Sequence, residues 1–318
     1  MSEVGLHVLY AVVWLLIPLL AAGGLVFGER RLLGQMQDRY GPNRVGPFGA
    51  LQVAADAVKL LFKEDWVPPF VDRYVFVAAP AIILSTVLAS FAVIPLVPGF
   101  VVADLNVGLL FFLGMSSLGV YSVALAGWSS RSKYPLLGGL RAAAQMLGYE
   151  VFMGLSLLGV VVMAGSFNMS TIVEAQEGLW FIVPQFAGFV GFMVAGLAET
   201  RRIPFDLPEA ESELVAGFHT EYSGMKFGVF YVGEYIGITL ISVLITVLFL
   251  GGWLGPVLPG WAWFFLKTFL VLGLIITTRA ALPRLRYDQL MSMGWKVLLP
   301  LGLVNLMVTA AVVLAAQG

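Results

Sequence analysis

Long runs of apolar residues recur along the whole sequence, separated by shorter polar segments. A hydrocarbon core of roughly 30 Å is crossed by about 20 apolar residues in α-helical conformation. Eight segments meet that requirement and predict transmembrane helices at 7–28, 74–95, 105–128, 142–163, 179–198, 227–250, 261–278 and 297–316. The first has neither a basic n-region nor a small-residue cleavage site, so we expect a permanent helix and not a signal peptide. The predicted fold class is an all-α integral membrane protein.

The positions of the basic residues predict how these helices are oriented in the membrane. Of the 18 Lys and Arg residues, all but Lys267 lie in or beside the same alternate set of loops, whereas the loops at 97–104, 164–178 and 251–260 have none. Because basic loops stay on the cytoplasmic side, both termini are predicted to be periplasmic. Lys267 falls inside the seventh span, and we expect its long side chain to snorkel back to the interface.

The amino-acid composition excludes several partners and cofactors for this chain. Only 12% of the residues are charged, about half the share in soluble domains. A net charge of -1 without a basic tract indicates no nucleic-acid partner. The absence of cysteine excludes thiolate-bound iron–sulfur clusters, c-type haem and disulfides. Two histidines, His7 and His219, are too few and too badly placed for a bis-histidine haem. Electrons for any redox reaction must therefore come from another subunit.

The first cytoplasmic loop contains an amphipathic segment at 49–63. Its polar residues Gln52, Asp56, Lys59 and Lys63 fall on a stripe about 60° wide at 100° per residue. Such a helix either lies in the interface plane as an anchor or roofs a polar space. The narrow stripe, which mixes an acid with two bases, favours a cavity or cleft shared with the first span.

The loop after the fifth span is rich in acids. Pro204 and Pro208 are expected to end one helix and begin a short one. Five acids occur within 15 residues, namely Glu199, Asp206, Glu209, Glu211 and Glu213. A helix N-terminus would stabilise Glu209 and Glu211, but this simple explanation leaves the other acids unexplained. Glu209 and Glu213, four residues apart, are expected to repel each other and raise the pKa of at least one.

Two glutamates, Glu150 and Glu234, lie within predicted spans. An acid at the middle of a membrane helix costs roughly 2.5–3.5 kcal/mol, so its presence indicates a function. The alternatives are a proton relay and a permanently protonated or paired group that only ties helices together. We expect both side chains to face the protein interior and to approach each other or a water-filled path.

Several motifs match one family, in the family's order from the first span to the last loop. They include Glu29-Arg30-Arg31, Gly41-Pro42-Asn43-Arg44-Val45-Gly46-Pro47, Ala55-Asp56-Ala57-Val58-Lys59, Gln145-Met146-Leu147-Gly148-Tyr149-Glu150, Pro204-Phe205-Asp206-Leu207-Pro208-Glu209-Ala210-Glu211 and Arg286-Tyr287-Asp288-Gln289-Leu290. Over nearly its whole length the chain resembles the quinone-channel membrane subunit of respiratory complex I, the NADH:quinone oxidoreductase, equivalent to mitochondrial subunit 1.

The resemblance implies a subunit of a proton-pumping enzyme in the bacterial inner membrane, at the heel of its membrane arm. Its substrate would be quinone, and this chain would hold no metal, haem, flavin or iron–sulfur cluster. Its partners would be cluster-bearing peripheral-arm subunits on the cytoplasmic face, together with small and antiporter-like membrane subunits and lipid.

The resemblance also implies site residues. The quinone channel would involve Arg30, Arg44, Asp56, Lys59, Phe227, Arg279 and Asp288. The proton relay would involve Glu150, Glu199, Glu209, Glu211, Glu213 and Glu234. Some family members have an acid in the third span beside the position of Ser117, where this chain has Ser116-Ser117. The route between the outer and inner carboxylates is therefore expected to depend on water and hydroxyls.

Two other functions fit part of this pattern. Membrane subunits of energy-converting hydrogenases share the carboxylates but bind no quinone, and the Gly-Pro-Asn-Arg-Val-Gly run and the amphipathic helix favour the quinone branch. A proton-coupled secondary transporter would also carry intramembrane acids and a helix broken by proline. The sequence has no clear internal repeat of the kind that such transporters show.

Overall fold

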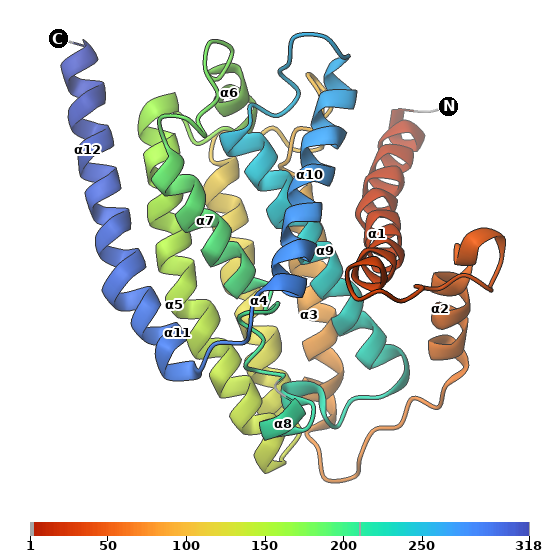
Figure 1. Ribbon diagram of the computed structural model, residues 1–318. Coiled ribbons are helices and arrows are strands. Elements are labelled where there is room, and N and C mark those ends of the chain that lie inside the picture. The colour runs from red at the N-terminus through yellow and green to blue at the C-terminus, as the bar shows by residue number, and fades with distance from the viewer. Residues whose placement is uncertain (1–2, 210, 318) are drawn as a thin grey trace.

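The structure is a computed structural model that describes residues 3–209 and 211–317, and for 3–11, 13, 211–212 and 317 it describes the backbone alone. Within these residues the fold is helical and contains no β-strand. The long helices, together with the shorter α7, are α1 (Glu3–Met36), α3 (Arg73–Phe91), α4 (Gly108–Ser129), α5 (Lys133–Ala164), α7 (Phe186–Glu199), α9 (Gly224–Phe249), α10 (Gly260–Ala281) and α12 (Leu299–Gln317). They run side by side as one bundle (Figure 1).

Short helices lie between the long ones. They are η1 (Pro47–Gly49), α2 (Gln52–Phe62), α6 (Met169–Glu174), α8 (Glu211–Leu214), η2 (Gly217–His219), α11 (Tyr287–Met293) and the π-helical η3 (Gly294–Leu298). Figure 1 shows α8 at the end of the bundle opposite α6, and α2 at the side of the bundle near the C-terminal end of α1. The first turns of α1 and the last turns of α12 lie at the same end as α6.

Six helices in the described part of the chain are long and apolar enough to cross a membrane: α3, α4, α5, α9, α10 and the continuous stretch from α11 to α12. Helix α1 has 34 residues and α7 has 14. Each of the eight predicted segments overlaps one of these eight helices. The chain is therefore a multi-pass helical membrane protein, as the hydrophobic pattern predicts.

Several helix boundaries differ from the prediction. Helix α1 continues to Met36, so Glu29 and Arg30 are helical and not part of a loop. Helix α5 begins at Lys133, nine residues before the apolar run, because Pro135 lies in the first turn, where proline is tolerated. Helix α7 begins only at Phe186, since Pro184 lies in the turn before it. An apolar run identifies the part of a helix that faces lipid. The backbone hydrogen bonds of the helix can continue past that run, until a residue such as proline ends them.

Lys267 does not reach water. Its side chain is buried, and Nζ donates hydrogen bonds to the carbonyl oxygens of Leu250, Gly252 and Leu254 at 2.6, 3.1 and 2.6 Å. Nζ also lies 4.1 Å from the ring centroid of Trp180. The expectation that Lys267 snorkels back to the interface is therefore wrong. Its ammonium group instead binds carbonyl oxygens at the C-terminus of α9, where a cation is favoured.

Helices α4 and α5 approach closely at two glycines. A Cβ on Gly127 would lie 2.5 Å from the carbonyl oxygen of Pro135 and 3.0 Å from Cα of Gly139. Small residues at a crossing of membrane helices let the backbones pack together. This contact fixes α4, which carries Ser116 and Ser117, against α5, which carries Glu150.

We predict that Gly127→Ala destabilises the protein by about 1–3 kcal/mol, because the added methyl forces the two backbones apart. Thermal unfolding of the purified protein measures the effect. Gly114→Ala on the same helix is the matched control, since a Cβ there would meet nothing within 4 Å. Equal melting temperatures for the two variants would contradict the close-packing argument.

Candidate functional site

A buried cluster of charged side chains joins four parts of the chain. Arg202, just after α7, pairs through Nε with Oε1 of Glu234 on α9 at 2.6 Å. Its Nη1 lies 3.6 Å from Oε1 of Glu29 on α1, which also accepts a hydrogen bond from Arg279 of α10. Side-chain exposure is 5% for Glu29 and 9% for both Arg202 and Glu234. Buried charges persist when they are paired, and here each carboxylate has a guanidinium partner.

The turn after α7 places Arg202 of the cluster and its neighbour Arg201. The backbone of Thr200 and Arg201 still bonds to the last turn of α7, and Arg201 adopts a φ of 54°. The guanidinium of Arg202 lies 4.5 Å from the ring centroid of Tyr235, and that of Arg201 lies 4.9 Å from Phe218. Among the described residues, Nε and Nη1 of Arg201 have no hydrogen-bond partner although they are buried.

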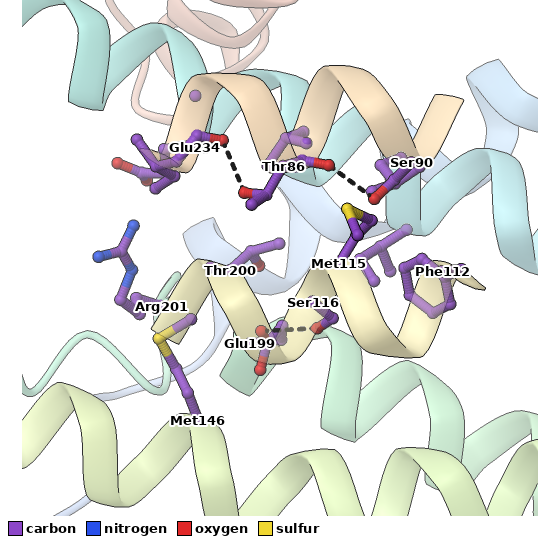
Figure 2. Close-up of a pocket in the computed structure, with 17 residues that line it drawn as sticks. Thr86, Ser90, Phe112, Met115, Ser116, Met146, Glu199, Thr200, Arg201 and Glu234 are labelled. Atoms are coloured by element: carbon purple, nitrogen blue, oxygen red, sulfur yellow. Dashed lines mark hydrogen bonds between the residues drawn. The ribbon is translucent and has the colours of Figure 1, made fainter. Parts of the chain in front are cut away.

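A small cavity of about 70 Å³ lies beside this cluster, between α3, α4, α9 and the end of α7. Its polar lining consists of Thr86, Ser90, Ser116, Glu199, Thr200, Arg201 and Glu234 (Figure 2). A water molecule needs roughly 10–15 Å³ of such space together with polar partners. The cavity is therefore large and polar enough for several waters.

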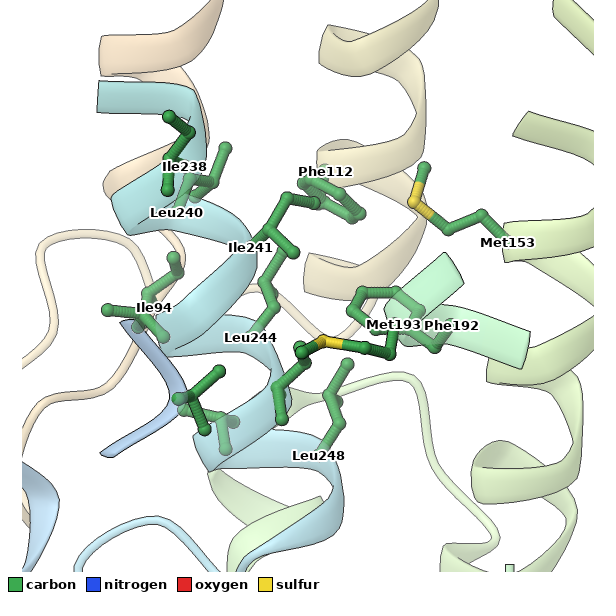
Figure 3. Packing of buried hydrophobic residues seen from close by; sticks show 14 of the residues in the cluster. Ile94, Phe112, Met153, Phe192, Met193, Ile238, Leu240, Ile241, Leu244 and Leu248 are labelled. Atoms are coloured by element: carbon green, nitrogen blue, oxygen red, sulfur yellow. The ribbon is translucent and has the colours of Figure 1, made fainter. Parts of the chain in front are cut away.

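Apolar side chains form the rest of the cavity wall. Phe112, Leu240 and Ile241 line it and belong to the main hydrophobic core, where Phe112 and Ile241 face each other (Figure 3). The cavity wall is thus mostly apolar, with the polar side chains of Glu199 and Glu234 among its lining.

Adjacent serines of α4 connect two carboxylates. Ser116 Oγ donates to Oε1 of Glu199 at 3.0 Å, and Ser117 Oγ donates to Oε1 of Glu150. Adjacent positions on a helix point about 100° apart, so each hydroxyl serves a different neighbouring helix. Glu150 and Glu234 are both partly buried, with 9% of the Glu234 side chain exposed, and Glu234 pairs with Arg202 and not with Glu150. Glu199 and Glu234 both line the cavity, and Glu150 does not.

The acidic loop is held by separate pairs. Asp206 Oδ2 accepts from Arg284 at 3.0 Å, Glu213 pairs with Arg141 at 2.6 Å, and Glu209 lies 3.8 Å from Nδ1 of His219. The expected repulsion between Glu209 and Glu213 is wrong, because α8 begins at Glu211, after Glu209, and the half-exposed Glu213 turns to α5. The side chain of Glu211 lies outside the described residues.

Burial controls protonation in this loop. It raises the pKa of Asp206 to about 6, against the attraction of Arg284, and it also raises the pKa of Glu209. Burial lowers the pKa of His219 to about 4, so the imidazole is neutral at neutral pH. Glu209 therefore contacts a neutral imidazole at neutral pH, and the two side chains do not form an ion pair.

A larger cleft of about 530 Å³ opens between α1, α2 and α9. Arg30 Nη1 pairs with Asp56 Oδ2 at 2.6 Å, and Gln52 donates to Oδ1 of Asp56 at 3.0 Å. Burial alone would raise the pKa of Asp56, but these hydrogen bonds hold it below its ordinary value. Lys59 lies at the edge of the cleft, 3.9 Å from Asp56, with a side chain that is 74% exposed. The inner part of the polar stripe therefore faces a cleft shared with α1, while Lys59 and Lys63 are exposed.

The expected channel residues divide into three groups. Arg30, Asp56, Lys59 and Phe227 line the cleft, Arg279 joins the buried cluster through Glu29, and Arg44 and Asp288 are exposed elsewhere on this chain. Glu29 and Arg202 were missed as site residues. Glu29 shares a helix face with buried Ala22 and Leu25, at spacings of three and four, and that periodicity could have identified it.

Long apolar helices around a buried ion-paired cluster define a polytopic helical membrane protein with a polar interior. Residues 8–310 match the family model described as NADH dehydrogenase, and the chain belongs to that family. It is accordingly a membrane component of an NADH oxidoreductase, complex I.

We predict that Arg202→Met destabilises the protein by about 3–5 kcal/mol, because it leaves Glu234 buried without its counter-ion. The double variant with Glu234→Met should recover much of that loss, since both charges are then removed. Thermal unfolding of the four proteins in the cycle measures the coupling. Arg73→Met, at an exposed position on α3, is the control. Additive losses in the double variant would contradict the pairing.

A second prediction concerns Asp206, whose pKa in the folded protein lies above its ordinary value of 3.8. The folded state binds this proton more tightly, so the associated stability is present below pH ~4 and is lost as the pH rises through about 6. Asp206→Asn should flatten that part of the melting temperature–pH profile. Exposed Asp38→Asn should leave the profile like that of the wild type, and an unchanged Asp206→Asn profile would show that Asp206 does not titrate there.

Proposed function

We propose that this chain is the quinone-channel membrane subunit of a proton-pumping NADH:quinone oxidoreductase, which binds quinone and couples its reduction to proton movement. The observation that carries the proposal is the arrangement of two consecutive residues of α1. Arg30 faces the α1–α2–α9 cleft, and Glu29 joins the buried cluster that continues through Arg202 to Glu234. A change of charge beside Arg30 in the cleft would therefore act next to Glu29, the adjacent residue of α1, which belongs to the buried cluster.

The cleft suits a hydrophobic quinone. Its volume of about 530 Å³ falls within the range of roughly 300–1,000 Å³ that small-molecule sites occupy. The walls are mostly apolar, from residues such as Leu19, Val26 and Val232. The polar side chains of the lining are Arg30, Asp56, Lys59, Tyr231 and Tyr235. In this proposal Arg30, Asp56, Lys59 and Phe227 bind or guide quinone, and Arg279 acts through Glu29. Arg44 and Asp288 act where neighbouring subunits complete the channel.

Reduction of a quinone to quinol consumes two electrons and two protons. This chain has no cysteine and a single histidine outside the first span, so cluster-bearing subunits on the cytoplasmic face would supply the electrons. Glu234, Glu199 and Glu150 would respond to the change of charge, with waters in the cavity and the hydroxyls of Ser116 and Ser117 joining them. Glu209, Glu211 and Glu213 would connect this relay to the cytoplasmic loop.

The same proposal includes the topology. Eight spans, with both termini on the periplasmic side of a bacterial inner membrane, fit the distribution of basic residues. Small and antiporter-like membrane subunits would cover the outer helices. Helix α12 is apolar and largely exposed, so it is available for such a contact.

We predict that Ser116→Ala slows proton-coupled quinone reduction by roughly fivefold, the kinetic equivalent of one lost hydrogen bond of about 1 kcal/mol. The measurement is quinone reductase activity and proton pumping by the assembled enzyme in vesicles. Ser116→Thr should retain the rate, because its hydroxyl can still donate to Glu199.

Ser85→Ala is the matched control, since the hydroxyl of Ser85 bonds only to the backbone of its own helix. Cluster reduction by NADH should remain normal in every variant. Full activity and pumping in Ser116→Ala would exclude a hydroxyl link in the relay.

A further inference from the structure

A second cavity, of about 580 Å³, adjoins the cleft at the cytoplasmic end of the bundle. It is lined by Lys59, Leu60 and Lys63 of α2 and its C-terminus, and by 222–224 and Phe227 at the start of α9. Lys59, Leu60 and Phe227 also line the cleft, so the two spaces meet at these side chains. The cleft is mostly apolar apart from Arg30, Asp56, Lys59 and two tyrosines, and the second space carries the ammonium groups of Lys59 and Lys63.

The charges around this cavity favour an anion. The carboxylate nearest Lys59 is Asp56, 3.9 Å away, which already pairs with Arg30 at 2.6 Å. Asp65 pairs with Lys226 at 2.5 Å, and Glu64 lines neither space. Among the described residues, no carboxylate lies within 4 Å of Lys63. Lys63 is therefore left for a ligand, and Lys59, whose contact with Asp56 is long at 3.9 Å, lies one helical turn away.

The neighbouring surface indicates what kind of anion fits. The outer face of α2 exposes Val58, Leu61 and Phe62, the last with 87% of its surface accessible. A helix with a basic edge and an exposed apolar face lies at the level of lipid headgroups. A soluble phosphate would use only the lysines, whereas a phospholipid also fills the adjoining apolar cleft.

We propose that Lys59 and Lys63 bind the phosphate of an anionic phospholipid, one acyl chain of which lies in the α1–α2–α9 cleft. The hydroxyl of Ser223 is a further donor, because its contact with the carbonyl oxygen of Glu64 is long, at 3.5 Å. The acyl chain passes Leu60 and Phe227, the side chains at which the two spaces meet. This lipid site goes beyond the proposed quinone function. Its phosphate site at Lys63 does not depend on quinone, but its acyl chain occupies the end of the cleft in which that proposal places quinone, at Leu60 and Phe227.

The test measures lipid retention by the assembled, detergent-purified complex with native mass spectrometry. Dioleoylphosphatidylglycerol should bind more tightly than dioleoylphosphatidylcholine, and the preference should weaken with salt. Lys63→Gln should lower the affinity for phosphatidylglycerol roughly fivefold, the effect of about one basic residue at an anionic lipid surface. Lys63→Arg should restore it.

Lys133→Gln, at an exposed position at the start of α5, is the matched control and should bind lipid like the wild type. Size-exclusion profiles establish that each variant assembles. Equal retention of the two lipids, or equal phosphatidylglycerol binding by the Lys63→Gln and Lys133→Gln variants, would overturn the proposal. Displacement of phosphatidylglycerol by millimolar inorganic phosphate would also overturn it, because the site would then recognise a soluble anion.

Discussion

The constraint on which the rest of the structure depends is the burial of Glu29, Arg202 and Glu234 inside an apolar bundle. Removing charged groups from water costs several kcal/mol each unless partners replace the solvent. Here the partners come from different helices, so the helices must meet at one level. Helix α1 therefore extends beyond its apolar run, α7 ends just before Arg202, and α9, the most deeply buried helix, carries Glu234.

The same cluster separates two spaces with different properties. Both spaces have mostly apolar walls, but the α1–α2–α9 cleft has a volume of about 530 Å³, whereas the cavity that Glu199 and Glu234 line has about 70 Å³. The two are divided by the charged side chains and not by a thick layer of packed residues, since Tyr235 lines the cleft and contacts Arg202. A ligand in the cleft can therefore alter the electrostatic potential at Glu234 without touching it.

The sequence predicts the positions of the helices better than it predicts the contacts between side chains. Apolar runs identify a segment that must avoid water, and every such run overlaps a helix here. Boundaries at Lys133 and Met36 were missed because helix continuation depends on local breakers and not on hydropathy. Glu199 and Glu234 could be predicted, since an acid beside or within a span needs a special environment. The pairing of Glu213 with Arg141 could not, because it joins residues 72 positions apart.

The two serines of α4 let this helix contact two carboxylates without an acid of its own. A hydroxyl both donates and accepts a hydrogen bond, so it can join a carboxylate to a water without carrying charge. A third carboxylate between Glu150 and Glu199 would have to be ionised beside two others or protonated, and either state costs free energy in a buried site. Neutral hydroxyls avoid that cost. The link then depends on geometry, which the close approach of Gly127 to Gly139 fixes by holding α4 against α5.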